Sequence, residues 1–176
     1  MPLEVSVSMT APLPIDPLDE PLHEFVEAVK YFLTFNVDPL EQPTFNPADD
    51  IRRKWEEAKR HLTEFHGVVV NAEPEIDRRH RLIAETGRAV LPLTNDRQID
   101  GPVRDLMKMA SADRADLRIL KRRIGKAGSV FGFSALVVAT VQIGPRMVQR
   151  RQQMIVKLDE LTTYYLWQMP PREPGS

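Results

Sequence analysis

The chain has 176 residues, of which 42% are apolar and 28% are charged. This length suits one domain with tails, and the composition is ordinary for a globular protein and too polar for a membrane protein with several spans. A net charge of −1 gives the whole chain no attraction to nucleic acid or anionic lipid, and the absence of cysteine excludes disulfides, thiolate metal sites and cysteine nucleophiles.

Charge is distributed unevenly along the sequence. Residues 1–50 contain ten acidic side chains and one basic side chain, Lys30, whereas residues 117–158 contain nine lysines and arginines and no acid. The N-terminal part is therefore acidic, and the segment around the most apolar stretch is basic. The first 20 residues contain no basic residue and no long apolar run, so we expect neither a signal peptide nor a cleaved presequence.

The first half of the chain predicts an extended arm and three helices. Repeated prolines in 1–17 favour the arm. Apolar residues at helical spacing predict a first helix at about 21–35. A second helix is expected between Asn46, a suitable N-cap, and Gly67, a suitable C-cap. A third helix is expected at about 73–90.

The second half predicts long amphipathic helices. Pro102 opens a seven-residue apolar repeat in which Asp113 is the one polar intrusion. A break or a kink is expected near Ser111, which is able to cap a new helix. Gly144 and Pro145 are expected to end or kink the helix before them, because proline lacks a backbone donor.

These elements predict an all-α protein, a bundle of long amphipathic helices with one transmembrane helix. Nothing in the sequence alternates as strands do. The expected organisation is an arm at 1–17, a helical region outside the membrane at 18–110, a basic helix leading into an apolar helix at 111–145, an amphipathic helix at 146–169 and a disordered tail at 170–176.

The transmembrane prediction rests on the stretch between Lys126 and Arg146, which has nineteen residues and no charge. As a helix it is roughly 28 Å long, close to the ~30 Å hydrocarbon thickness of a bilayer. Its serine, threonine, glutamine and glycine residues make it a weak inserter, which favours help from partner helices. We therefore expect a membrane span at about 127–145. The alternative is the central helix of a soluble bundle.

Small residues recur in and just before this stretch. Gly128 and Gly132 form a GxxxG motif, and three more small residues extend its three- and four-residue spacing. On one helix such a stripe allows another backbone to approach closely. The expected helix-packing interface consists of Gly125, Gly128, Gly132, Ala135 and Ala139.

Basic residues flank the apolar stretch on both sides. They suit anionic lipid headgroups or an acidic partner, which is either another protein or the acidic N-terminal half of the chain. Nucleic acid is not an expected partner, because neither stacking aromatics nor a recognisable reading module accompanies them. The residues expected to make these contacts are Arg118, Lys121, Arg122, Arg123, Lys126, Arg146, Arg150 and Arg151.

Candidate chemistry is sparse. Glu20 with His23 and Asp77 with His80 have the acid-x-x-His spacing of di-iron bundles, but chance produces such pairs at this composition. No nucleophile with a base and no phosphate-binding loop is recognisable. We therefore expect no metal, no cofactor and no enzymatic activity.

The sequence predicts a non-enzymatic accessory or assembly subunit of a multi-subunit membrane complex. One helix at about 127–145 anchors it and packs on other subunits through the small-residue face. A bacterial or mitochondrial inner membrane fits this expectation. The alternative is a soluble helical bundle that acts as a protein-interaction or membrane-active, pore-forming effector.

Overall fold

A computed structural model describes residues 17–34 and 51–168, apart from the side chains of 51–56, 58, 59, 61, 62 and 166–168. Within these ranges the chain forms helices and turns and no strand, so the predicted all-α fold is confirmed. The expected arm (except its last residue), the cap at Asn46 and the tail at 170–176 lie outside the described residues.

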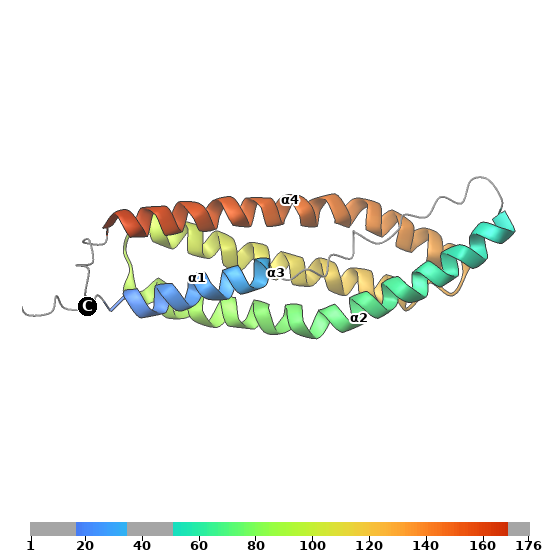
Figure 1. Cartoon of the computed structure of the whole chain (residues 1–176), viewed down its shortest axis with the longest axis horizontal. Helices are drawn as coiled ribbons and strands as arrows, with labels where there is room; N and C mark the ends of the chain where they lie inside the picture. The colour runs from blue at the N-terminus through green and yellow to red at the C-terminus, as the bar shows by residue number, and fades with distance from the viewer. Residues whose placement is uncertain (1–16, 35–50, 169–176) are drawn as a thin grey trace, which may run out of the picture.

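Four α-helices make up the described part of the molecule (Figure 1). They are α1 at Asp19–Leu33, α2 at Ile51–Val90, α3 at Arg97–Ile124 and α4 at Val130–Gln168, with the short 3-10 helix η2 at Leu91–Leu93 between α2 and α3. Successive helices run antiparallel and contact each other, and α1 also contacts α4. The helices therefore close into an up-and-down bundle. Because α1 is the shortest α-helix, it covers only part of the length of the bundle.

Helix α1 follows its prediction closely. It begins and ends within two residues of the expected bounds, and acidic Asp19 and Glu20 occupy its first turn, where the helix dipole favours negative charge. The four residues that predicted it are all buried. They are Leu22, Phe25, Val29 and Phe32.

Helix α2 replaces the two separate helices expected at about 46–67 and 73–90, so that expectation is wrong. Gly67 lies inside one continuous helix of 40 residues, and so does Pro74. The buried line of Phe65, Val69 and Ala72 joins the two expected segments at helical spacing. Burying this line against the rest of the bundle outweighs the local signal for a helix end at Gly67.

Helices α3 and α4 are also longer than expected. Asp96 caps α3 by accepting a hydrogen bond from the amide of Gln98 at 2.9 Å, so α3 begins before Pro102. The break expected near Ser111 is wrong, because Asp113 continues the buried face instead of interrupting it. The boundary expected at 110/111 therefore falls inside a helix.

Helix α4 continues through Pro145, so the expected end of a helix at this position is wrong. The proline removes the hydrogen-bond partner of the carbonyl four residues earlier, at Val141. Val141 is 68% exposed and Pro145 is also exposed, so water is able to reach this carbonyl. The boundary expected at 145/146 likewise lies inside α4.

Candidate interaction site

The apolar stretch forms the first half of α4, and one side of it faces the bundle. Phe133 and Leu136 are buried there, and Ile143 and Met147 pack with Leu120 of α3. This inner face belongs to the core of the bundle that the described helices form. Burying such large apolar side chains favours the packed state by about 1.5–3 kcal/mol each.

The opposite side of α4 is apolar as well, but it is exposed. Phe131 is 89% exposed. The exposed apolar residues of α4 are Val130, Phe131, Val138, Val141, Val148, Ile155 and Val156. Among the described residues, α4 is the one helix long and apolar enough to cross a membrane, by length and composition alone. Its apolar stretch thus has a covered face and an uncovered face.

The predicted small-residue stripe does not lie on one helix. Gly125 caps the end of α3, where its amide donates to the carbonyl of Lys121 at 3.1 Å, and Gly128 lies in the following turn. Only Gly132, Ala135 and Ala139 belong to α4. The expectation of a single continuous face is therefore wrong, because the chain reverses between Ile124 and Val130. Ala139 is buried beside Leu120, within the chain.

Gly132 has a role inside the chain. A side-chain Cβ at this position would overlap the carbonyl of Lys126, with the carbonyl carbon at 2.9 Å and the Cα of Ala127 at 3.2 Å. The amide of Gly132 donates to the hydroxyl of Ser129 at 3.1 Å. A residue without a side chain therefore lets the turn fold tightly onto the first turn of α4. Contact of the small residues with another chain remains a prediction.

The basic residues after the apolar stretch bind acids of α3. Arg150 donates to Asp113 at 2.6 Å and to Asp116 at 2.7 Å, and Arg146 donates to Asp116 at 2.9 Å. Arg151 lies 3.4 Å from Asp113. The side chain of Asp113 is 1% exposed, and burial raises its pKa while the two arginines oppose that rise.

Arg146, Arg150 and Arg151 therefore have acidic partners within the chain, and these partners lie on α3 and not in the acidic N-terminal part. Their contact with lipid or with another chain stays a prediction. The sequence did contain one signal for the ion pairs: Asp113 stands where the apolar repeat requires a buried residue, and a buried carboxylate needs a cationic partner.

Two basic residues before the apolar stretch also have partners within the bundle. Lys121 pairs with Glu73 on α2, and Arg118 lies 3.5 Å from Asp77 on the same helix. Asp77 is bound more directly by Arg114, whose hydrogen bond lowers the pKa of Asp77. These pairs fasten α3 to α2 and account for two of the eight basic residues singled out from the sequence.

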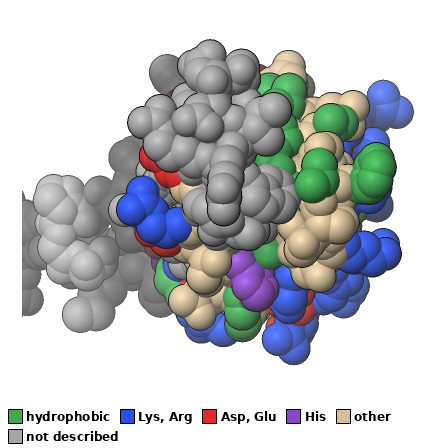
Figure 2. Space-filling view, turned by 90° about the vertical axis from the view of Figure 1, so that its right-hand side faces the viewer, with side chains coloured by type: hydrophobic (Ala, Val, Ile, Leu, Met, Phe, Trp, Pro, Cys, Tyr) green, Lys and Arg blue, Asp and Glu red, His purple; other side chains and the backbone are tan. Residues whose placement is uncertain are grey.

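Three of the predicted basic residues remain exposed at the turn between α3 and α4. Arg122, Arg123 and Lys126 have no ion pair with another described residue. Figure 2 looks onto this end of the molecule and shows hydrophobic side chains gathered beside lysines and arginines. Val130 and Phe131 supply exposed apolar surface at the same turn. The end of the α3–α4 hairpin is thus both basic and apolar.

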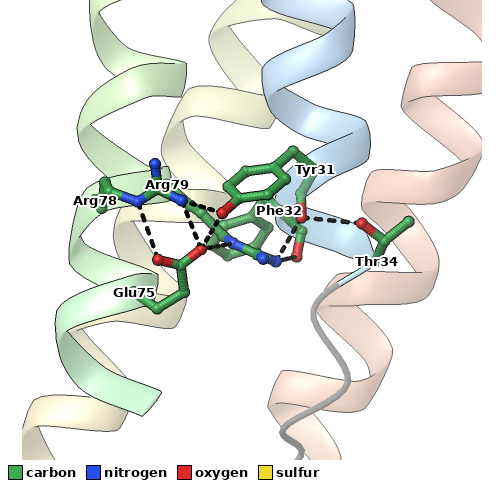
Figure 3. A network of polar contacts seen from close by, with 6 residues as sticks. All are labelled: Tyr31, Phe32, Thr34, Glu75, Arg78 and Arg79. Carbon is green, nitrogen blue, oxygen red and sulfur yellow. Dashed lines mark hydrogen bonds and ion pairs between the residues drawn. The ribbon is translucent and has the colours of Figure 1, made fainter. Parts of the chain in front are cut away.

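A second polar network joins the end of α1 to α2 (Figure 3). Arg79 is buried, donates to the backbone carbonyls of Tyr31 and Phe32, and binds Glu75 at 2.8 Å. Its guanidinium also lies 3.7 Å from the centre of the Tyr31 ring. Because the last carbonyls of a helix lack intrahelical partners, Arg79 acts as a side-chain cap for α1.

Glu75 makes the stability that this network contributes depend on pH. Hydrogen bonds from Arg78, Tyr31 and Arg79 lower the pKa of Glu75 from 4.5 to about 2. A carboxyl group whose pKa is lower in the folded state stabilises the fold above its unfolded pKa, and this contribution is lost as the pH falls from about 4.5 to about 2.

The unfolding temperature of the protein is therefore expected to fall across this range more steeply than that of Glu75→Gln. Glu24→Gln, at an exposed position on α1, is the matched control. Identical slopes for Glu75→Gln and the unchanged protein would contradict this role.

The acid-x-x-His pairs do not come together. Asp77 is engaged by arginines, His23 is exposed, and no group of three or more potential ligands is found in the described ranges 17–34 and 51–168. His80 is half-buried, and burial lowers its pKa, with the positive charge of Arg114 as a further cause. The charged groups of the described residues therefore form ion pairs within the bundle, and no metal-binding group is found among them.

No protein-family model, curated protein or solved structure matches this chain. What can be said of function therefore rests on the site. Within residues 17–34 and 51–168, its features define a class of molecule, a bundle of four α-helices with an exposed apolar face on α4.

Proposed function

We propose that this chain is a non-enzymatic assembly protein, a helical bundle whose helix α4 docks on a helix of another polypeptide chain. The observation that carries the proposal is the exposed apolar face of α4, which includes Phe131, Val138 and Val141. Contiguous apolar surface of this kind is typical of interaction sites, because leaving it in water is unfavourable.

Membrane attachment is the second candidate. In this form the chain is an accessory subunit of a multi-subunit membrane complex, in a bacterial or mitochondrial inner membrane, and residues at about 127–145 are the anchor. The length and composition of α4 favour it. Arg122, Arg123 and Lys126, at the start of the anchor, would then contact anionic lipid headgroups.

If α4 crosses a membrane, α3 has to move away from it. Residues 117–124 of α3 run alongside the apolar part of α4, and they include Arg118, Lys121, Arg122 and Arg123. Charged side chains of this kind are expensive within a bilayer. The two helices therefore have to separate before α4 can cross. Separation exposes Leu120 and strains the ion pairs around Asp113, so the closed bundle is the form we favour.

The two candidates are distinguished by locking α3 to α4. The chain has no cysteine, so Leu120→Cys with Ala139→Cys introduces a single pair at two positions that pack in one cluster. We expect the oxidised variant to stay monodisperse without detergent and to keep the partners of the unchanged protein. Each single-cysteine variant, treated with the same oxidant, is the control.

A membrane anchor predicts the opposite result. The unchanged chain would then need detergent and resist alkaline extraction from membranes, and the oxidised double variant would be released. These two results together would refute docking of the closed bundle and support membrane attachment.

A further inference from the structure

The outer side of α4 carries an exposed line of uncharged residues. They recur alternately three and four residues apart over most of the helix. We call this line the outer seam. It consists of Phe131, Ser134, Val138, Val141, Pro145, Val148, Gln152 and Ile155.

The spacing of the outer seam indicates which surface fits it. A repeat that averages about 3.5 residues is the one by which two α-helices pack side by side along a supercoil. From Phe131 to Ile155 the seam extends over about 36 Å. A second long helix is therefore the occupant that matches both the repeat and the length of the seam.

The outer seam has the same pattern from either end. Each of its positions has a counterpart at an equal distance on the other side of residue 143. The matching pairs are Phe131 with Ile155, Ser134 with Gln152, Val138 with Val148 and Val141 with Pro145. If two copies of α4 pack antiparallel about this point, each apolar residue of one copy faces an apolar residue of the other. Ser134 of each copy then faces Gln152 of the other.

Charges at the two ends of the seam favour the same arrangement. Arg122, Arg123 and Lys126 are exposed near its beginning. Just beyond its end, Asp159 and Glu160 are exposed, and Lys157 pairs with Glu160 at 3.1 Å, so these three residues together leave this end with a net negative charge. Antiparallel packing brings the basic end of each copy to the acidic end of the other, twice in one dimer. Parallel packing would bring like charges together, which is unfavourable.

From these observations we propose that a second copy of this chain docks antiparallel on the outer seam, so that α4 forms the centre of a two-fold symmetric dimer. The inference rests on the proposed function in its closed-bundle form and names the partner helix. Two-fold symmetry requires a self-complementary surface, and the pattern of the outer seam meets that requirement.

An anionic membrane surface fits the seam less well. Asp159 and Glu160 would lie against it at one end, and Ser134 and Gln152 would enter its apolar layer. Nor is the antiparallel dimer compatible with a single-pass anchor, because all copies of such an anchor cross the membrane in the same direction.

The experiment uses a charge exchange across the seam. Val138 of one copy faces Val148 of the other in the antiparallel dimer, whereas the two positions lie about 15 Å apart within one helix. We measure the mass of the purified full-length chain by light scattering and sedimentation over a wide range of concentrations. The unchanged protein is expected to be a dimer. Val138→Glu alone and Val148→Lys alone should each weaken the dimer by at least about tenfold, because each places an unpaired charge in the seam.

The double variant, Val138→Glu with Val148→Lys, should recover the dimer, because each glutamate then faces a lysine of the other copy. Val70→Glu is the matched control, since Val70 is similarly exposed on α2, away from the seam. It should leave the dimer unchanged. Helix content measured by circular dichroism is expected to be the same in all variants, because both seam positions are exposed.

Other outcomes overturn the inference in recognisable ways. A chain that is monomeric at every concentration refutes the dimer, and single-variant losses without recovery in the double variant refute the antiparallel arrangement. If the monomer instead floats with vesicles containing anionic lipid, and Val138→Glu abolishes flotation, the seam binds lipid and the dimer is refuted. The proposed function itself fails only if Val138→Glu changes neither self-association nor lipid binding nor the complexes that the chain forms.

Discussion

Replacing Arg150 with alanine is expected to lower the free energy of unfolding by about 3–5 kcal/mol, the usual result of removing one partner from a buried ion pair. Arg150 binds two carboxylates of α3, and one of them, that of Asp113, is 1% exposed. Without Arg150 this charge keeps only the longer contact with Arg151, at 3.4 Å. Urea denaturation followed by circular dichroism measures the change.

A paired substitution separates the ion pair from simple loss of packing. Asp113→Leu combined with Arg150→Met removes both charges and keeps apolar bulk, so it should recover most of the stability lost in Arg150→Ala. Arg104→Ala, which breaks an exposed pair with Asp100, serves as the control and should change stability little. A loss below about 1 kcal/mol for Arg150→Ala would mean that water or another cation compensates Asp113.

The second large effect is expected at Gly132. Gly132→Ala should destabilise the protein by about 1–3 kcal/mol, because the new Cβ overlaps backbone atoms of Lys126 and Ala127, which cannot rotate away as a side chain does. Gly128→Ala is the matched control, since a Cβ there meets nothing within 4 Å. Thermal unfolding of the two variants, measured side by side, tests the difference.

This comparison also tests the GxxxG prediction. If the motif serves mainly as an interface with another chain, both glycine variants should weaken assembly, and neither should change the stability of the isolated chain. We expect instead that Gly132→Ala alone loses stability. Equal stability of the two variants would contradict a role for Gly132 in closing the turn.

Much of the fold was predictable because apolar spacing decides which residues are buried. Val103, Leu106 and Ala110 belong to the apolar repeat after Pro102 and are buried, and Met154 and Leu161 are buried in the segment where an amphipathic helix was expected. Helix ends were less predictable. Gly67 and Pro145 are local signals for a break, but the packing of the neighbouring residues favours a continuous helix and overrides them.

The site was predictable only in part, for a physical reason. Sequence spacing shows that Arg146 and Arg150 flank an apolar stretch, but it does not show that α3 returns alongside with Asp113 and Asp116. A basic residue beside an apolar stretch therefore suggested contact with lipid. For Arg146 the partner is instead Asp116, which lies 30 residues earlier in the sequence. The side of α4 that the bundle covers was also hard to predict, because a helix that is apolar all round gives no sign of which side is buried.

The order of the helices has a consequence for folding kinetics. Most of the contacts between the described helices join neighbours in sequence, and the contact between α1 and α4 joins more distant parts of the chain. Chains dominated by such local contacts have a low contact order, and helical bundles of this type fold in microseconds to milliseconds. Hairpins such as α3–α4 are able to form before the bundle closes. Rapid-mixing experiments on the full chain should therefore find most of its helix formed early.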